Sequence, residues 1–92
     1  MNISPDGVTV RFKTVPEELF LAEKSGAKSN IVCILDADEY KQLRQREPQK
    51  IIIQHEQEIF LRTLTHVYVS DMILGKYLAV FSWQHIREVV RR

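Results

Sequence analysis

Hydrophobic and polar side chains alternate near the N-terminus, over residues 8–15. Val8, Val10 and Phe12 fall on one side of an extended chain, and the polar or basic residues between them fall on the other. An alternation with a period of two is typical of a half-buried strand. We therefore expect a strand here, with a basic face turned toward solvent.

The pattern then changes to one that predicts a helix at residues 16–25. Pro16 suits the first helical position, where its missing N–H costs nothing, and two glutamates in the first turn complement the helix dipole. Gly26 is a natural residue for the end of the helix. The apolar run at 30–35 that follows predicts a strand buried on both faces.

A second, exposed helix is expected at residues 37–46. Asp36 and Glu39 have the spacing of a capping box, with aspartate in place of the usual serine or threonine. The apolar stripe of this helix is narrow, so its anchoring to the core is expected to be weak. Pro48 ends it, because the residue before a proline avoids the helical region.

Three strands are expected in the second half of the chain, at residues 50–55, 58–70 and 76–83. Tight turns near 56–57 and at 70–75 join them, so these strands pair as antiparallel hairpins. Tyr77, Ala79, Phe81 and Trp83 form an aromatic-rich stripe that we assign to the core. Residues 84–92 add either a last strand or a short helix, and the spacing of their apolar residues favours the helix.

These elements predict one α+β domain over residues 1–92, in the order β-α-β-α-β-β-β with a possible C-terminal helix. At this length a small, mostly antiparallel, partly open β-barrel with one or two short helices limits the number of exposed strand edges.

Composition and charge narrow the function classes. The chain carries 13 basic and 12 acidic residues, so nucleic-acid binding would need a local basic patch. Cys33 is the only cysteine, lies in an apolar run and is expected to be a buried thiol, which fits a reducing, cytoplasmic setting. The sequence has neither the pattern of a signal peptide nor a run long enough to span a membrane, so no membrane association is expected.

No constellation of residues supports catalysis or a cofactor. His55, His66 and His85 lie on different elements without metal-ligand spacing, so no metal site is expected. The acidic clusters sit at predicted helix starts, where the dipole alone accounts for them. One strand face mixes aromatic and polar side chains and is the better candidate for a ligand surface. Its members are Phe60, Arg62, Leu64, His66 and Tyr68.

Residues 25–33, Ser-Gly-Ala-Lys-Ser-Asn-Ile-Val-Cys, follow the first helix and resemble the ASCH domains, which share the PUA-like β-barrel. Gly26 and Lys28 match the start of the family signature Gly-x-Lys-x-x-Glu-x-Arg. Ile31 and Cys33 stand where the family has glutamate and arginine. The resemblance implies RNA or nucleotide binding in a cleft beside the first helix, with Lys28 as a contact. Some members hydrolyse acetylated cytidine with a lysine, a threonine and that glutamate, and residue 31 here is no carboxylate.

The leading hypothesis is a non-enzymatic domain with a PUA-like barrel that binds RNA or another nucleic acid through a local basic patch. The candidate contacts are Lys28, Arg11, Lys13 and Arg62. Such contacts to phosphates would give salt-sensitive, sequence-independent binding. The alternative is a protein–protein adaptor or homodimeric module, because a thin core, an edge strand and alternating aromatic strands suit β-augmentation.

Overall fold

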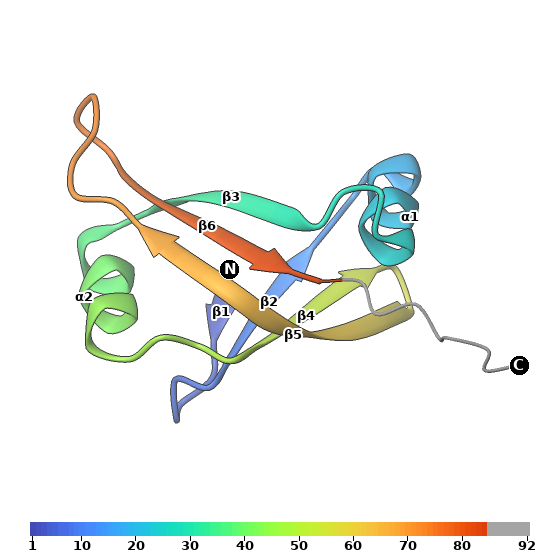
Figure 1. Ribbon diagram of the computed structural model, residues 1–92, viewed down its shortest axis with the longest axis horizontal. Helices are drawn as coiled ribbons and strands as arrows, with labels where there is room; N and C mark the ends of the chain where they lie inside the picture. Colours follow the sequence, from blue (N-terminus) through green and yellow to red (C-terminus); the bar gives the residue numbers. More distant parts are fainter. Residues whose placement is uncertain (85–92) are drawn as a thin grey trace, which may run out of the picture.

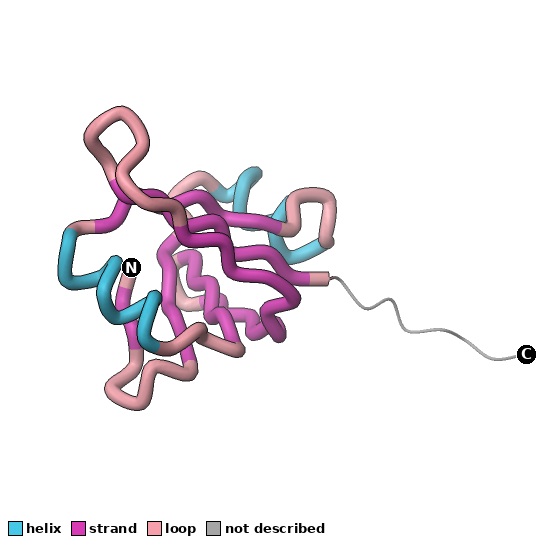
Figure 2. Tube along the Cα trace, turned by 60° about the vertical axis from the view of Figure 1, so that its left-hand side comes forward, coloured by secondary structure: helices cyan, strands magenta, loops and turns pink. Residues whose placement is uncertain are grey.

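Six strands form one mixed sheet that curls into a half-barrel, with a helix at each end (Figures 1 and 2). The structure is a computed structural model and describes residues 1–84. Its elements are β1 (Asn2–Ile3), β2 (Thr9–Lys13), α1 (Glu17–Ser25), β3 (Asn30–Leu35), α2 (Ala37–Gln45), β4 (Lys50–His55), β5 (Glu58–Val69) and β6 (Tyr77–Trp83). The expected α+β, partly open barrel is confirmed at this level. The expected C-terminal helix falls almost entirely on residues 85–92, outside the described residues.

The strands lie in the order β1-β2-β4-β5-β6-β3. Within the described chain β2 and β4 form the one parallel pair, and the other four pairings are antiparallel, as expected for a mostly antiparallel sheet. The parallel pair arises because α1, β3 and α2 all lie between β2 and β4 in the sequence, so the chain returns in the same direction. The two-residue strand β1 was not predicted.

Both helices lie within one residue of their predicted bounds, and a predicted cap is present at one end of each. Pro16 is the residue before α1 rather than its first helical residue, and Gly26 ends the helix in the left-handed region at φ 88°. At α2 the Asp36 carboxylate accepts the Glu39 N–H at 2.8 Å, and the Glu39 carboxylate accepts the Asp36 N–H at 3.1 Å. The capping box is therefore confirmed.

The expectation that residues 30–35 are buried on both faces is wrong. β3 lies at the edge of the sheet and pairs with β6 alone among the described strands. Val32 is 62% exposed and Ile34 is 59% exposed, while Leu35 at the end of the strand is buried. Cys33 points toward the core side and is half-buried, and this burial raises the pKa of its thiol. A continuous apolar run does not reveal whether a second layer covers its outer face.

The prediction that one mixed aromatic and polar face runs along the whole of β5 is also wrong, because the strand changes register between Leu64 and His66. The irregularity adds one residue and reverses which side chains face the core. Phe60 before it and Val67 after it are both buried, although an odd spacing of seven positions would place them on opposite faces of a regular strand. Tyr68 therefore points outward, on the side opposite to Phe60.

The core fills the inside of the half-barrel and includes the predicted stripe on β6, of which Ala79, Phe81 and Trp83 are buried. Phe81 packs edge-on against Phe12 from β2, with ring centroids 5.3 Å apart. The other buried hydrophobic residues are Val10, Phe20, Leu35, Leu43, Ile51, Ile53, Phe60 and Val67. Each large side chain among them contributes roughly 1.5–3 kcal/mol through burial.

Candidate functional site

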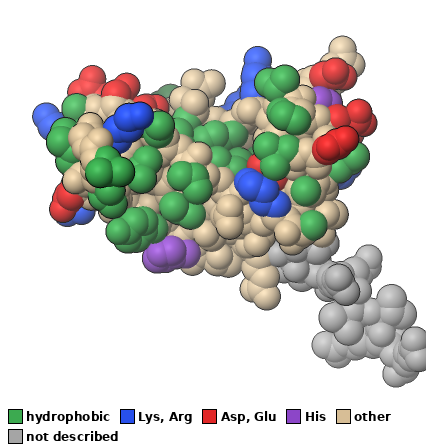
Figure 3. All heavy atoms as spheres, turned by 90° about the horizontal axis from the view of Figure 1, so that it is seen from above, with side chains coloured by type: hydrophobic (Ala, Val, Ile, Leu, Met, Phe, Trp, Pro, Cys, Tyr) green, Lys and Arg blue, Asp and Glu red, His purple; other side chains and the backbone are tan. Residues whose placement is uncertain are grey.

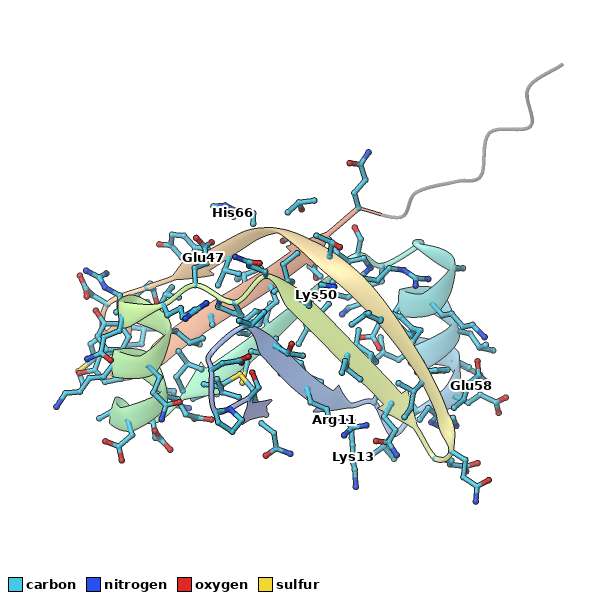
Figure 4. The ribbon with its side chains drawn as sticks, turned by 90° about the horizontal axis from the view of Figure 1, so that it is seen from below. Arg11, Lys13, Glu47, Lys50, Glu58 and His66 are labelled. Atoms are coloured by element: carbon cyan, nitrogen blue, oxygen red, sulfur yellow. The ribbon has the colours of Figure 1, made fainter. Side chains whose placement is uncertain are left out.

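The four basic residues expected to form one patch lie in two separate places. Arg11 and Lys13 extend from the exposed face of β2 (Figure 4). Lys28 and Arg62 lie instead at the C-terminal end of α1, where both contact groups of the protein itself. The chemistry of these two places is different.

Lys28 neutralises a buried carboxylate. Its Nζ lies 3.4 Å from Oε2 of Glu23, a side chain that is 1% exposed, and it also donates to the carbonyl of Asn30. Gly26 makes this arrangement possible, because the chain reverses there and the Lys28 N–H then donates to the Ala22 carbonyl at 3.0 Å. The charge of Lys28 is thus already paired within the fold.

Glu23 belongs to a group of polar side chains that we call the buried corner: Thr14, Glu23, Lys28 and His55. Thr14 Oγ1 donates to Glu23 Oε1 at 2.6 Å, and His55 Nδ1 lies 2.9 Å from the Thr14 carbonyl oxygen. The His55 ring stacks on Phe20 with centroids 5.3 Å apart. A buried charge is tolerated when it is paired and hydrogen-bonded, and both conditions hold here.

A hydroxyl beside a carboxylate is also an arrangement that can generate a nucleophile. Thr14 is only 7% exposed, however, and Glu23 is less exposed still. The shallow hollow nearby is lined by Lys13, Thr14, Val15, Gln54, His55 and Glu56. The hydroxyl hydrogen of Thr14 is donated to Glu23 and points away from this hollow. The buried corner therefore suits the attachment of α1 to the sheet better than it suits the activation of a nucleophile.

Glu23 was not predicted from the sequence to have a special role. The signal that could have found it is its spacing from Phe20, since residues three apart share one face of a helix. That spacing places a carboxylate on the buried face of α1. A charge at such a position demands a partner, and Thr14 and Lys28 supply it.

Arg62 caps the end of α1. Its Nη2 donates to the carbonyl of Lys24 at 3.0 Å, in the last turn of the helix, where carbonyls lack helical partners. Its Nη1 donates to the Leu61 carbonyl, and its guanidinium lies 4.7 Å from the centroid of the Phe60 ring. These contacts fix Arg62 against the protein and leave little of it for a ligand.

Arg11 and Lys13 remain open to solvent. Neither makes an ion pair or a side-chain hydrogen bond with another residue in the described range 1–84. Strand pairing places Thr9, on the same face of β2, beside the exposed Lys50 of β4. We call these three cations, Arg11, Lys13 and Lys50, the basic face (Figure 4). Lys50 was missed because its proximity depends on the parallel β2–β4 pairing.

Apolar side chains lie next to the basic face. Arg11 stands beside Ile52, which pairs in turn with the exposed Leu61 of β5. Lys13 stands beside Gln54, which pairs with the exposed Ile59. The outer surface of this half of the sheet therefore combines cations along β2 with flat apolar positions along β5.

Within residues 1–84, no group of three or more His, Cys, Asp or Glu side chains is arranged to hold a metal ion. His85 lies outside that range. No helix of the described chain is long and apolar enough to cross a membrane. The comparisons with known proteins found no matching family model, no matching curated protein and no matching solved structure.

Proposed function

We propose that this protein is a non-enzymatic binding domain that contacts RNA or another nucleic acid through the basic face. The observation that carries the proposal is the placement of Arg11, Lys13 and Lys50 on one solvent-exposed side of two paired strands. Cations that follow a strand at alternate positions suit a phosphate backbone, and contacts of this kind fix a nucleic acid without reading its sequence. The nearly balanced net charge makes this local grouping the main source of attraction.

The proposal keeps two of the four residues expected from the sequence. Arg11 and Lys13 stay as contacts and Lys50 joins them, whereas Lys28 and Arg62 are assigned to the support of α1. The ASCH-like and PUA-like assignment and the cytoplasmic location belong to the same proposal. They rest on the Gly26–Lys28 motif and on the lone Cys33.

Single-stranded binding also draws on flat apolar surface against which bases can lie. Ile52 and Leu61, in line with Arg11, provide such surface in this protein. Neither residue is aromatic, so the stacking contribution is expected to be small and the salt-dependent contribution dominant. Affinity should therefore be modest and should fall steeply with ionic strength.

Fluorescence anisotropy with a short labelled single-stranded RNA tests the proposal. If three phosphates are neutralised, a plot of log affinity against log salt concentration is expected to have a slope of about −2. The variant with Arg11→Glu and Lys13→Glu should lose most of the binding and flatten that slope. Both side chains are exposed, so its unfolding midpoint should stay close to that of the wild type.

The matched control is Lys41→Glu combined with Lys76→Glu, which makes the same change in net charge at exposed positions outside the basic face. It should bind RNA nearly as well as the wild type. Equal losses in both double variants would show that only overall charge matters, and absence of binding by the wild type at low salt would refute the proposal.

A further inference from the structure

The outer edge of β3 carries backbone groups that no described strand pairs. The Trp83 N–H donates to the Ser29 carbonyl at 3.0 Å, which fixes how hydrogen-bonded pairs alternate between β6 and β3. In an antiparallel ladder every second residue turns its N–H and C=O toward the partner strand. Asn30, Val32 and Ile34 are the residues that turn theirs the other way, toward the edge of the sheet.

The uncovered part of this edge is short and apolar. Lys28 Nζ donates a hydrogen bond to the Asn30 carbonyl. The Ile34 carbonyl accepts a hydrogen bond from the Cys33 thiol, a weak donor, at 3.4 Å. The side chains of Val32 and Ile34 are both more than half exposed. Figure 3 views the molecule from the side on which β3 lies and shows hydrophobic side chains spread across this surface. A strand edge of this composition is prone to pair with another strand.

We propose that this edge binds a second copy of the chain, with β3 pairing antiparallel to β3 of that copy around a two-fold axis. In the register that uses the uncovered residues, Val32 stands opposite Ile34 of the second copy, and the reverse holds on the other side of the axis. These two pairs provide about four backbone hydrogen bonds. The two six-stranded sheets then join into one continuous sheet.

Charge complementarity is the reason to expect a second copy rather than an unrelated strand. Lys28, the more exposed partner of its ion pair with Glu23, lies just before β3. Asp36 and Asp38 lie just after the end of β3, at exposed positions. An antiparallel two-fold brings the start of one β3 to the end of the other. The basic end of each copy therefore meets the acidic end of its neighbour twice in one interface, as self-complementary two-fold interfaces require.

The hairpin between β5 and β6 adds apolar surface to the same arrangement. Met72, Ile73 and Leu74 at its tip are all exposed, Leu74 to 96%. The tip lies beyond the C-terminal end of β3, and α1 lies beyond the other end (Figure 1). The two-fold therefore brings the tip of one copy to the α1 side of the other, where Leu21 is half-exposed.

The proposed register brings the Cys33 residues of the two copies together. It places Cys33 directly opposite Cys33 of the second copy, in a pair that does not exchange backbone hydrogen bonds. The Cα atoms of such pairs are about 4.5 Å apart, which is within the range of roughly 4.4–6.8 Å that a disulfide bridges. The single cysteine of the chain thus reports the register without any mutation.

Two measurements test the proposal. Sedimentation equilibrium over a series of protein concentrations should give twice the chain mass at the upper end. Treatment with copper–phenanthroline, which accepts the two electrons lost by two thiols, should yield a disulfide-linked dimer that Cys33→Ser abolishes. The double variant Val32→Lys, Ile34→Lys should raise the dimer dissociation constant by about tenfold or more, because it sets lysines opposite lysines.

Ile59→Lys is the control, since Ile59 is an exposed residue of β5 that lies outside β3 and pairs with Gln54 of β4. It should leave the dimer intact, and circular dichroism should show that all variants keep the fold. A protein that stays monomeric at every concentration overturns the proposal. A dimer that survives the double lysine change and forms no Cys33 disulfide places the interface elsewhere and overturns it as well. RNA binding by the basic face is unaffected by either result.

Discussion

Single residues decide how α1 is attached to the sheet. Glu23 brings a carboxylate to the inside of the protein, and its two oxygens are satisfied by Thr14 on one side and Lys28 on the other. Lys28 reaches it because Gly26 reverses the chain. The lysine expected to bind phosphate therefore has a structural role that would be needed with or without a ligand.

We expect Lys28→Glu to lower the free energy of unfolding by about 1–3 kcal/mol, because it sets a second carboxylate against the buried Glu23. The value lies below that for a fully buried pair, since the Lys28 side chain is 37% exposed and partly screened by water. Urea denaturation measures the change. Lys41→Glu, an equal change of charge on the exposed face of α2, serves as the control. Equal midpoints for both variants would contradict the structural role.

At the scale of elements, the stability of α2 depends on the hydrogen bonds that cap it and on a few contacts with the sheet. Leu43 is its one fully buried hydrophobic side chain. Tyr40 stacks on Tyr77 of β6 with ring centroids 4.3 Å apart and donates a hydrogen bond to Asp71 in the hairpin between β5 and β6. A nine-residue helix with so little buried surface is close to the limit of stability, so the capping box matters more than it would in a longer helix.

Asp36→Ala should therefore cost about 1 kcal/mol of stability, because the Glu39 N–H loses its acceptor. Asp36→Asn keeps a side-chain oxygen in the same position and should cost much less. Thermal or urea unfolding of the two variants, compared at one protein concentration, separates the cap from the charge. Identical losses would show that the negative charge of Asp36 matters rather than its hydrogen bond.

At the scale of the whole molecule, the hydrophobic core fills the inside of the curled sheet, and much of the outside of the sheet is exposed to solvent. The two helices lie at the ends of the half-barrel (Figure 1). Within residues 1–84 the outward-facing side chains in the middle of β2 and β3 are exposed, and those of β4 are partly exposed. One end of the strand order presents the basic face and the other presents the apolar edge of β3. The two proposals thus use different surfaces and do not compete.

The stability of this arrangement rests on one small core. We expect Phe81→Ala to cost about 3–5 kcal/mol, because Phe81 is fully buried and packs against Phe12. Domains of this size have a total stability on the order of 5–15 kcal/mol, so the variant should be close to unfolding. Ile59→Ala, at a half-exposed position, should cost under about 1 kcal/mol. Urea unfolding followed by tryptophan fluorescence compares the two, and a small loss for Phe81→Ala would contradict a single shared core.

The sequence by itself determined the local structure. Three short-range patterns appear in the structure as predicted: the alternation over β2 and β6, the capping box at Asp36 and the glycine after α1. The bounds of most elements lie within one or two residues of the predicted ones. Local patterns suffice because strand alternation and helix capping depend on neighbours within four residues.

Only the tertiary structure decided which surfaces are open and which charges are free. Nothing local in residues 30–35 reveals that β3 lies at an edge, and nothing near Arg62 reveals that its guanidinium meets the end of α1. Lys50 joins Arg11 and Lys13 only because β4 returns parallel to β2, and the register shift after Leu64 reverses the faces of β5. Each of these outcomes depends on contacts between residues far apart in the chain, and the periodicity of a single segment carries no information about its partner.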